Sequence, residues 1–251
     1  MLPKWHTRYL HAKYAIEALG NVRGRILDVG AGQGGITTAL AKLLPRLIFF
    51  ACDNNTKQLK IFKKNNAISN VKINCTLCDA YNLAYRNDYF GAVTMFDVLE
   101  HLGNPEKSIL EVDRVLRKRG VFHLVVPCEA DIWTIDGLVK NIFKVNLKKE
   151  PIGHIQQFKS VNLRKMLKNY NFRVVTTKYS YHFIYQLLSF GYFIYLYLFN
   201  KRKYLPLTSK IRPAGSIIKP LSMIFGFLAN LESTLMAKIP GQTMHITAVK
   251  L

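Results

Sequence analysis

The segment RILDVGAGQGG (residues 25–35) decides the fold that this chain of 251 residues can adopt. Its apolar half predicts a short buried strand (25–30), and its glycines break that strand before an apolar helix (36–44). Glycine lets the backbone turn sharply and lets a ligand approach it closely. A strand, a glycine-rich loop and a helix in this order therefore predict a ligand site at the end of the strand.

Strands and helices alternate on both sides of this segment. Apolar runs predict buried strands at 47–53, 71–79, 92–99, 121–127, 172–180 and 244–251. Apolar residues at helical spacing predict helices at 8–19, 56–66, 105–119 and 160–169. Continuous apolar strands that alternate with helices are typical of a parallel sheet covered on both faces. The sequence therefore predicts an α/β fold with a Rossmann-like sheet.

Two acids narrow the choice of ligand for the glycine loop. Gly30, Gly32 and Gly35 satisfy the pattern GxGxxG, so a dinucleotide-dependent dehydrogenase is one candidate. Asp28, before the loop, would repel a pyrophosphate, whereas it suits a ligand with an ammonium or sulfonium group. Asp53 ends the next strand, where it can accept hydrogen bonds from ribose hydroxyls.

The chain is both strongly basic and apolar. It has 36 Lys and Arg against 15 Asp and Glu, a net charge of +21, while 49% of its residues are hydrophobic. This apolar content excludes a disordered chain. The charge is uneven, because residues 151–251 contain 14 basic residues and one acid, Glu232. A basic and apolar C-terminal part predicts an anionic, partly apolar partner, with a membrane surface favoured over nucleic acid.

Cysteine usage and the N-terminal residues predict the compartment. Four cysteines are too few for a disulfide scaffold at this length, and Cys75 and Cys78 form a lone CxxC, so we interpret the thiols as structural. Residues 1–19 lack an apolar run of signal-peptide length. We therefore expect a reduced, cytoplasmic protein.

Five successive segments resemble the motifs of class I S-adenosylmethionine-dependent methyltransferases: ILDVGAGQG, ACD, LCDAYNL, FDVLEHL and VLRKRGVFHLVVP. The resemblance implies a seven-stranded sheet whose last strand is antiparallel, with S-adenosylmethionine as the cofactor. It also implies a cofactor site that begins with Asp28, the acid before the loop. Gly30, Gly32 and Gly34 would line the methionine and ribose, and Asp53 with its neighbour Asn54 would hold the ribose. Asp79 and Ala80 would contact the adenine, and Phe96 and Asp97 would lie near the sulfonium.

The segment after the fourth strand carries the candidate catalytic groups. Asp97, Glu100 and His101 would share one face of a helical turn. This D-x-x-E-H is similar to the E-x-x-E-H segment of ubiquinone-biosynthesis O-methyltransferases and small-RNA 2′-O-methyltransferases, where it helps to bind a divalent metal. The resemblance implies Mg²⁺ or Mn²⁺ at these residues, although aspartate shortens the first ligand. The alternatives are His101 as general base or substrate orienter, and Glu100 with His101 as caps of the turn.

Other histidines and aromatic residues give weaker signals. GHIQQF (153–158) resembles a segment of lipid- and quinone-directed members of the family, which implies that His154 is catalytic and faces the substrate cavity. Trp133 could form an apolar wall of that cavity. A surface histidine and a core tryptophan are the alternatives. We interpret His6 and His11 as helix-surface residues.

Residues 179–200 are uncharged and long enough to span a hydrocarbon core of about 30 Å. The chain must nevertheless return to the same sheet, so we expect a monotopic insertion that meets anionic head groups through the basic residues of 201–219. A soluble lid is the alternative. The predicted parts are an N-terminal helix or lid, the cofactor domain and the insertion, which are residues 1–23, residues 24–180 with 244–251, and residues 181–243.

These observations lead to three functional hypotheses. The first is a methyltransferase that acts on a lipidic or membrane-held small molecule, such as a quinone or polyprenyl precursor or a lipid-linked sugar. O-methylation is the expected reaction, and C-methylation remains open. The second is an RNA methyltransferase, which the charge supports, and the third is an inactive cofactor-binding scaffold.

Overall fold

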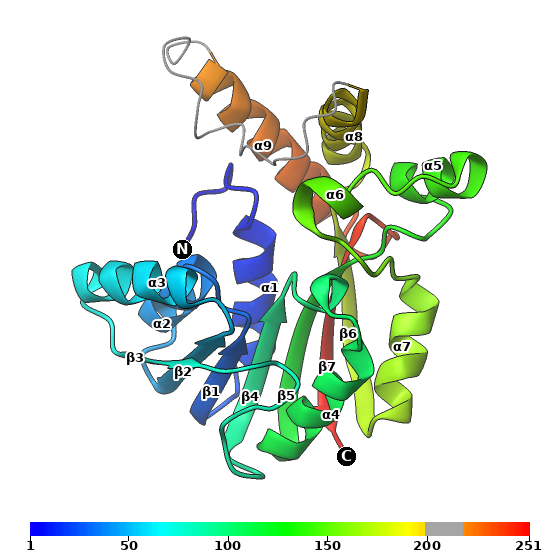
Figure 1. Cartoon of the computed structure of the whole chain (residues 1–251). Helices are drawn as coiled ribbons and strands as arrows, with labels where there is room; N and C mark the ends of the chain where they lie inside the picture. The colour runs from blue at the N-terminus through cyan, green and yellow to red at the C-terminus, as the bar shows by residue number, and fades with distance from the viewer. Residues whose placement is uncertain (199–217) are drawn as a thin grey trace.

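A computed structural model describes residues 1–198 and 218–251, and seven strands in this part of the chain form one sheet (Figure 1). The strand order is β3-β2-β1-β4-β5-β7-β6. In chain order the strands are β1 (Gly24–Val29), β2 (Leu47–Asp53), β3 (Ile73–Leu77), β4 (Phe90–Phe96), β5 (Leu116–Pro127), β6 (Phe172–Ser180) and β7 (Thr243–Lys250). The first five strands pair in parallel, and β7 runs antiparallel to both β5 and β6. The predicted α/β sheet with an antiparallel last strand is confirmed.

Helices cover both faces of the sheet (Figure 1). They are α1 (Tyr9–Leu19), α2 (Gly35–Leu43), α3 (Thr56–Ser69), the 3₁₀ turn η1 (Leu99–His101), α4 (Pro105–Val115), α5 (Ile135–Phe143), α6 (Lys149–Ile152), α7 (Ser160–Asn169), α8 (Phe183–Leu198) and α9 (Ile218–Leu235). Apolar residues of α1, α2 and α3 form one buried cluster with the sheet, and those of α4 and α7 form another. The sheet therefore has a hydrophobic core on each side.

Local side-chain contacts determine where two of these helices begin. The Asn55 side chain accepts hydrogen bonds from the first backbone N–H groups of α3, and Asn104 does the same for α4, whose first residue is Pro105. The expected helix at 105–119 is wrong in its last turn. It ends at Val115, because the buried Leu116 already pairs with Phe90 in the sheet.

The segment between β6 and β7 contains α8 and α9, which pack on each other. The single acid of this segment joins them, because the Glu232 carboxylate on α9 accepts a hydrogen bond from the backbone N–H of Ile184 on α8 at 3.1 Å. Within residues 1–198 and 218–251, no helix has both the length and the apolar character needed to cross a membrane. The basic residues of 201–212, and the side chain of Lys219, lie outside the described residues.

Asp28 joins three elements beneath the glycine loop. Its side chain is only 2% exposed, and its two carboxylate oxygens accept hydrogen bonds from the hydroxyls of Thr37 on α2 and Thr94 on β4. Burial raises the pKa of Asp28 to about 6, although both threonine hydroxyls act to lower it. The charged form of Asp28 therefore lowers the stability of the folded state, and this cost grows as pH rises toward 6.

Asp28→Asn should therefore gain stability relative to the wild type as pH rises. Since the pKa moves from 3.8 to about 6, the difference in unfolding free energy should change by about 2.4 kcal/mol between pH 4 and 7. Chemical denaturation at several pH values measures it. Asp88→Asn, at an exposed carboxylate, serves as the control, and parallel pH curves for the wild type and Asp28→Asn would contradict the prediction.

Candidate active site

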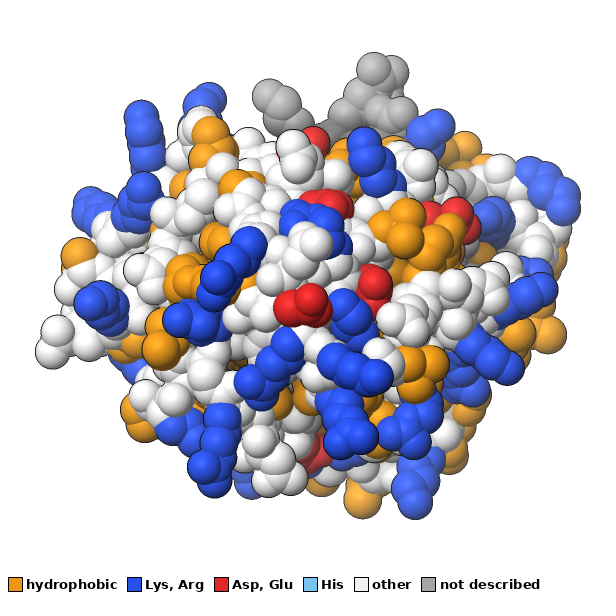
Figure 2. Space-filling view, turned by 90° about the horizontal axis from the view of Figure 1, so that it is seen from below, with side chains coloured by type: hydrophobic (Ala, Val, Ile, Leu, Met, Phe, Trp, Pro, Cys, Tyr) orange, Lys and Arg blue, Asp and Glu red, His pale blue; other side chains and the backbone are white. Residues whose placement is uncertain are grey.

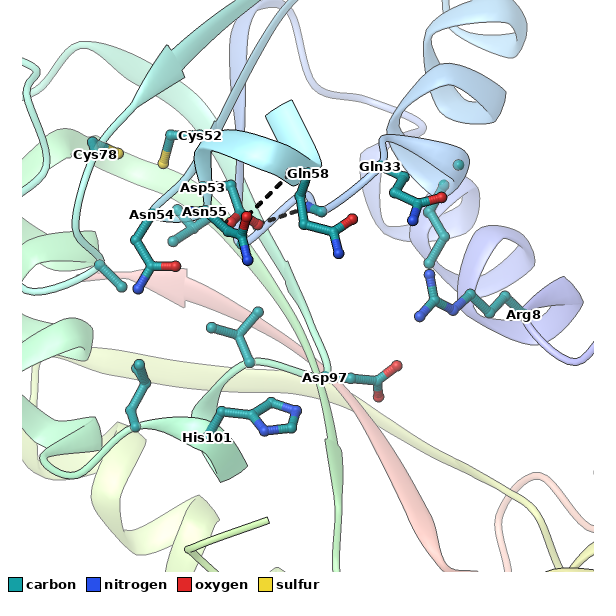
Figure 3. Close-up of a pocket in the computed structure, with 18 of the residues that line it drawn as sticks. Arg8, Gln33, Cys52, Asp53, Asn54, Asn55, Gln58, Cys78, Asp97 and His101 are labelled. Atoms are coloured by element: carbon teal, nitrogen blue, oxygen red, sulfur yellow. Dashed lines mark hydrogen bonds between the residues drawn. The ribbon is translucent and has the colours of Figure 1, made fainter. Parts of the chain in front are cut away.

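A cavity of about 1060 Å³ opens at the carboxyl ends of β1, β2 and β4 (Figure 3). The strand order reverses between β1 and β4, and ligands of open α/β sheets bind at such a point. The predicted site residues that line the cavity are Gly30, Gly32, Asp53, Asn54, Asp79, Ala80, Asp97 and His101. One cavity therefore brings together most of the residues that the sequence motifs selected.

The glycine loop and the end of β2 meet through Asp53. Its Oδ2 accepts a hydrogen bond from the backbone N–H of Gly32 at 2.8 Å, and its Oδ1 accepts one from Asn55 at 2.8 Å (Figure 3). Gly32 has a φ of 55°, and a Cβ added to it would meet no atom within 4 Å, so this stretch of backbone is open to a ligand. Each Asp53 oxygen keeps a lone pair for such a ligand.

The end of β3 supplies the opposite wall of the cavity. The backbone N–H of Cys78 donates to the carbonyl oxygen of Asp53 at 3.2 Å, which holds the segment after β3 against the end of β2. Asp79 is exposed at the cavity, and its Oδ1 accepts a hydrogen bond from the backbone N–H of Tyr81 at 2.9 Å. The turn therefore presents the carboxylate of Asp79 beside Ala80.

Several predicted site residues lie outside the lining of the cavity: Asp28, Gly34, Phe96, Glu100 and His154. Asp28 is buried among threonine hydroxyls, as described above. Gly34 has a φ of 77° and supports the loop from behind, because a Cβ there would lie 2.2 Å from the Phe62 ring. The expected placement of Trp133 in the cavity wall is also wrong, because its side chain is 45% exposed and lies elsewhere on the surface.

Asp97 has an unexpected partner. Its backbone lies in the left-handed region (φ 54°), and its carboxylate Oδ2 lies 3.4 Å from Nε2 of His11. Although burial alone would raise it, His11 holds the pKa of Asp97 below its usual value. The interpretation of His11 as a surface residue is wrong, because α1 places it in the core with 1% exposure. His6 lines the cavity instead.

Glu100, His101 and His154 form a cluster at the edge of the cavity, and one potential ligand atom from each lies within 4.8 Å of the others. Nδ1 of His101 lies 3.0 Å from the carbonyl oxygen of Gly153, and Nδ1 of His154 lies 3.0 Å from both Glu129 oxygens. Each imidazole therefore donates through Nδ1 and has Nε2 available. The expected trio with Asp97 is wrong, because the 3₁₀ turn separates Asp97 from this cluster and His154 takes its place.

The Glu100 carboxylate is fully buried, and neither of its oxygens has a hydrogen-bond partner among the described residues. Burial, followed by the nearby charge of Asp97, raises the pKa of Glu100 well above its usual value. Partial burial lowers the pKa of His101, so its imidazole is neutral near pH 7. The cluster therefore offers a neutral base at the cavity and, behind it, a carboxyl group whose Oε1 lies 4.0 Å from Nε2 of His154.

Comparison with known proteins relates these residues to an enzyme family. Residues 27–124 match the family model for a methyltransferase domain. The ubiquinone/menaquinone biosynthesis C-methyltransferase UbiE of Burkholderia mallei is 31% identical over 106 residues, which are 41% of this chain and 44% of that protein. This chain is therefore similar to methyltransferases over less than half of its length. The match spans less than half the length of the curated relative.

Solved structures share the fold of this chain. A putative methyltransferase from Bacillus halodurans has a TM-score of 0.64 at 20% identity, over 94% of this chain and 97% of that one. The [4+2]-cyclase SpnF has a TM-score of 0.64 at 17% identity, over 96% of this chain and 80% of that one. Because this fold occurs in a cyclase as well as in methyltransferases, the reaction has to be argued from the site.

A buried ionic network supports His154. Nζ of Lys148 lies 2.8 Å from both Glu129 Oε1 and Asp136 Oδ2, and Gln242 also donates to Asp136. Although burial alone would raise it, Lys148 and His154 lower the pKa of Glu129 to about 2. The sequence gives no indication of this network, since Glu129, Asp136, Lys148 and Gln242 come from separate segments and match no motif of the family.

Lys148→Met should strongly destabilise the folded protein. The substitution leaves the Glu129 and Asp136 carboxylates buried without their cation, which typically costs about 3–5 kcal/mol. Urea denaturation followed by circular dichroism measures the change. Lys144→Met, at an exposed lysine, should change stability by less than about 0.5 kcal/mol, and equal stabilities of the two variants would count against the network.

Proposed function

We propose that the chain transfers a methyl group from S-adenosylmethionine to a lipidic small molecule, such as a quinone or polyprenyl precursor. The observation that carries this proposal is the meeting of the glycine loop, Asp53 and Asp79 around one cavity at the strand ends. S-adenosylmethionine would supply a methyl group that is bound to a sulfonium sulfur, and this sulfur is a good leaving group. The chain's own residues would then need to hold the acceptor in line with that methyl group and exclude water.

The donor groups of the cavity fit this cofactor. Asp53 has acceptor capacity for ribose hydroxyls, Asp79 and Ala80 form the turn proposed for the adenine, and Gly32 leaves backbone open to the ligand. Asp97 adds a negative charge at the end of β4, which suits a sulfonium. The volume of about 1060 Å³ is at the upper end of the range for ligand pockets, which leaves room for an acceptor beside the cofactor.

Asp53→Ala should weaken binding of S-adenosylmethionine about tenfold or more, since it removes a charged hydrogen-bond acceptor. Isothermal titration calorimetry measures the affinity, and thermal denaturation checks that the variant folds. Asp88→Asn, at the amino end of β4, should bind as the wild type does. Undiminished affinity in a folded Asp53→Ala protein would refute the proposed ribose contact.

His101 is the proposed general base for the acceptor. With Nδ1 donating to the Gly153 carbonyl, the neutral ring has Nε2 available to take a proton at the cavity. We propose an oxygen as the acceptor atom. The relative named above is a C-methyltransferase, so an aromatic carbon is the second candidate, and a base would assist that reaction as well.

His101→Gln should lower the rate of methyl transfer to a membrane lipid extract by about 10²–10⁴. Since a base must be unprotonated, wild-type activity should fall as pH drops through the lowered pKa of His101, below 6.5. The variant should lose this acid limb, whereas His6→Gln should retain it. Radiolabelled S-adenosylmethionine at pH 5 to 8 provides the assay, and an acid limb that persists in His101→Gln would exclude His101 as the base.

A divalent metal is the alternative role for the cluster. Glu100 has unpartnered oxygens, and both histidines have the Nδ1 contact that orients ligating imidazoles toward a metal. Mg²⁺ or Mn²⁺ there would polarise an acceptor oxygen. Loss of activity with EDTA, restored by added Mg²⁺ or Mn²⁺, would assign the cluster to metal binding instead of proton transfer.

An anionic membrane surface is the proposed partner, because α8 exposes apolar side chains while it buries a polar one. It buries Gln186, whose amide accepts from the backbone of Ile135 and donates to Tyr181, while Leu187 and Leu188 are about half exposed. The neighbouring α9 also exposes apolar residues: Ile224, Phe225, Phe227, Leu228, Leu231 and Leu235. Such apolar patches mark contact surfaces.

Charge favours a membrane as the occupant of this surface. α5 packs beside α8 and exposes Ile142 and Phe143, while Asp131 and Asp136 in this region are buried. Among the described side chains of this region, Lys144 and Lys149 are exposed. Apolar side chains bordered by lysines are typical of helices that lie in the interface of anionic bilayers.

Leu187→Ser with Leu188→Ser should reduce binding to vesicles of phosphatidylglycerol and phosphatidylcholine several-fold, because both leucines are expected to enter the apolar layer. Flotation at low salt measures the bound fraction. Ile68→Ser, at an exposed position on α3, should leave it unchanged. Absence of wild-type binding, or a dimer in ultracentrifugation that the leucine variant dissociates, would assign the surface to a protein partner.

RNA is the second candidate acceptor, and the distribution of basic residues bears on it. Figure 2 shows Lys and Arg side chains spread over the end of the molecule opposite α8 and α9. Exposed Arg23, Arg25 and Lys118 lie at the amino ends of β1 and β5, whereas the cavity lies at the carboxyl ends. RNA held by these residues would lie away from the cavity, which supports the lipidic acceptor.

A further inference from the structure

Two cysteines of the cavity are neighbours that the sequence spacing does not pair. The CxxC motif joins Cys75 and Cys78, but side chains three residues apart on an extended segment point to opposite faces. Cys75 packs with the cluster under α2 and α3, whereas Cys52 and Cys78 belong to the cluster on the other face. In Figure 3 the sulfur atoms of Cys52 and Cys78 point toward each other at the cavity wall.

The backbone holds these two cysteines together. The N–H of Cys78 donates to the carbonyl oxygen of Asp53 at 3.2 Å, and Asp53 directly follows Cys52. The neighbouring Cys52 thiol lowers the pKa of Cys78, although burial opposes this shift. Cys78 is partly exposed, whereas Cys52 is 1% exposed. An accessible thiol beside a second thiol is typical of oxidation-sensitive sites.

We propose that Cys78 is an oxidation site, and that a hydroperoxide converts Cys52 and Cys78 into a disulfide that blocks the cofactor cavity. The Cys78 thiolate attacks one peroxide oxygen, the O–O bond breaks, and a sulfenic acid forms while the departing oxygen leaves as water or an alcohol. The Cys52 thiol then attacks the Cys78 sulfur and releases water. The two thiols are oxidised to a disulfide, and the peroxide is reduced.

The effect on the cofactor rests on the proposed function. Cys52 precedes Asp53, and Cys78 precedes Asp79, so a bond between the sulfurs would pull together the two backbones that carry the ribose and adenine contacts. Oxidised protein should therefore bind S-adenosylmethionine about tenfold or more weakly. Bound cofactor should in turn shield Cys78 from peroxide, because both occupy the same cavity.

Intact-mass spectrometry and peptide mapping after hydrogen peroxide treatment test the thiol chemistry without the cofactor. Wild type and Cys75→Ser should each lose two hydrogen atoms and yield a Cys52–Cys78 peptide, which dithiothreitol reverses. Cys52→Ser should accumulate a sulfenic acid at Cys78 that dimedone captures. A Cys75–Cys78 bond, or dimedone labelling of Cys78 no faster than that of Cys75, would overturn the proposal.

Calorimetry with S-adenosylmethionine, before and after oxidation, separates the two proposals. Weaker binding after oxidation in wild type and Cys75→Ser, but not in Cys52→Ser, supports the disulfide as a block of the cavity. If the disulfide forms but the reduced protein does not bind S-adenosylmethionine, the proposed function fails and the thiol site stands. If the reduced protein binds and oxidation leaves the affinity unchanged, the proposed block is refuted.

Discussion

The hydrogen bond from the Gly32 backbone to the Asp53 carboxylate is the contact on which the cavity depends. It joins residues 21 positions apart at 2.8 Å, because β1 and β2 lie side by side and end at the same edge of the sheet. The bond fixes the path of the glycine loop and the direction of the carboxylate together. Gly34 supports the same geometry from behind, where the Phe62 ring leaves no room for a side chain.

A second constraint comes from the return of the chain into the sheet. β7 pairs with both β5 and β6, so the segment between β6 and β7 leaves and re-enters at one end of the sheet, beside the cavity. There α9 holds the N-terminal residues that border the cavity. Asn230 donates to the carbonyl oxygens of Lys4 and His6, and Gly226 leaves space for the backbone of Trp5. The apolar helices and the mouth of the cavity therefore form one structural unit.

Features encoded locally could be predicted from the sequence. Apolar runs identified every strand of the sheet, and the residues that end β1, β2 and β3 pointed to the cavity, because parallel strands bring their carboxyl ends to one edge. Asp97 was placed incorrectly relative to Glu100, since a regular helical turn would align them and the observed 3₁₀ turn with a positive φ does not.

Contacts between distant segments could not be predicted from the sequence. His11 meets Asp97 across 86 positions, and Lys148 meets Glu129 across 19, with no spacing rule that could indicate either pair. The CxxC spacing gave no indication that Cys78 lies beside Cys52, because these two cysteines come from separate segments and Cys75 packs on the other face of the sheet. Tertiary packing determines which of these residues become neighbours, and this packing cannot be read from a single sequence.

The proposed transfer of a methyl group from this cavity to a lipidic acceptor can be tested by following the methyl group itself. The most direct test incubates the protein with methyl-labelled S-adenosylmethionine and a total cell extract, and then separates the organic-soluble fraction from RNA. The account predicts label in the organic fraction, lost when Asp53 is replaced by alanine. Label in RNA, or incorporation that survives the loss of Asp53, would contradict it.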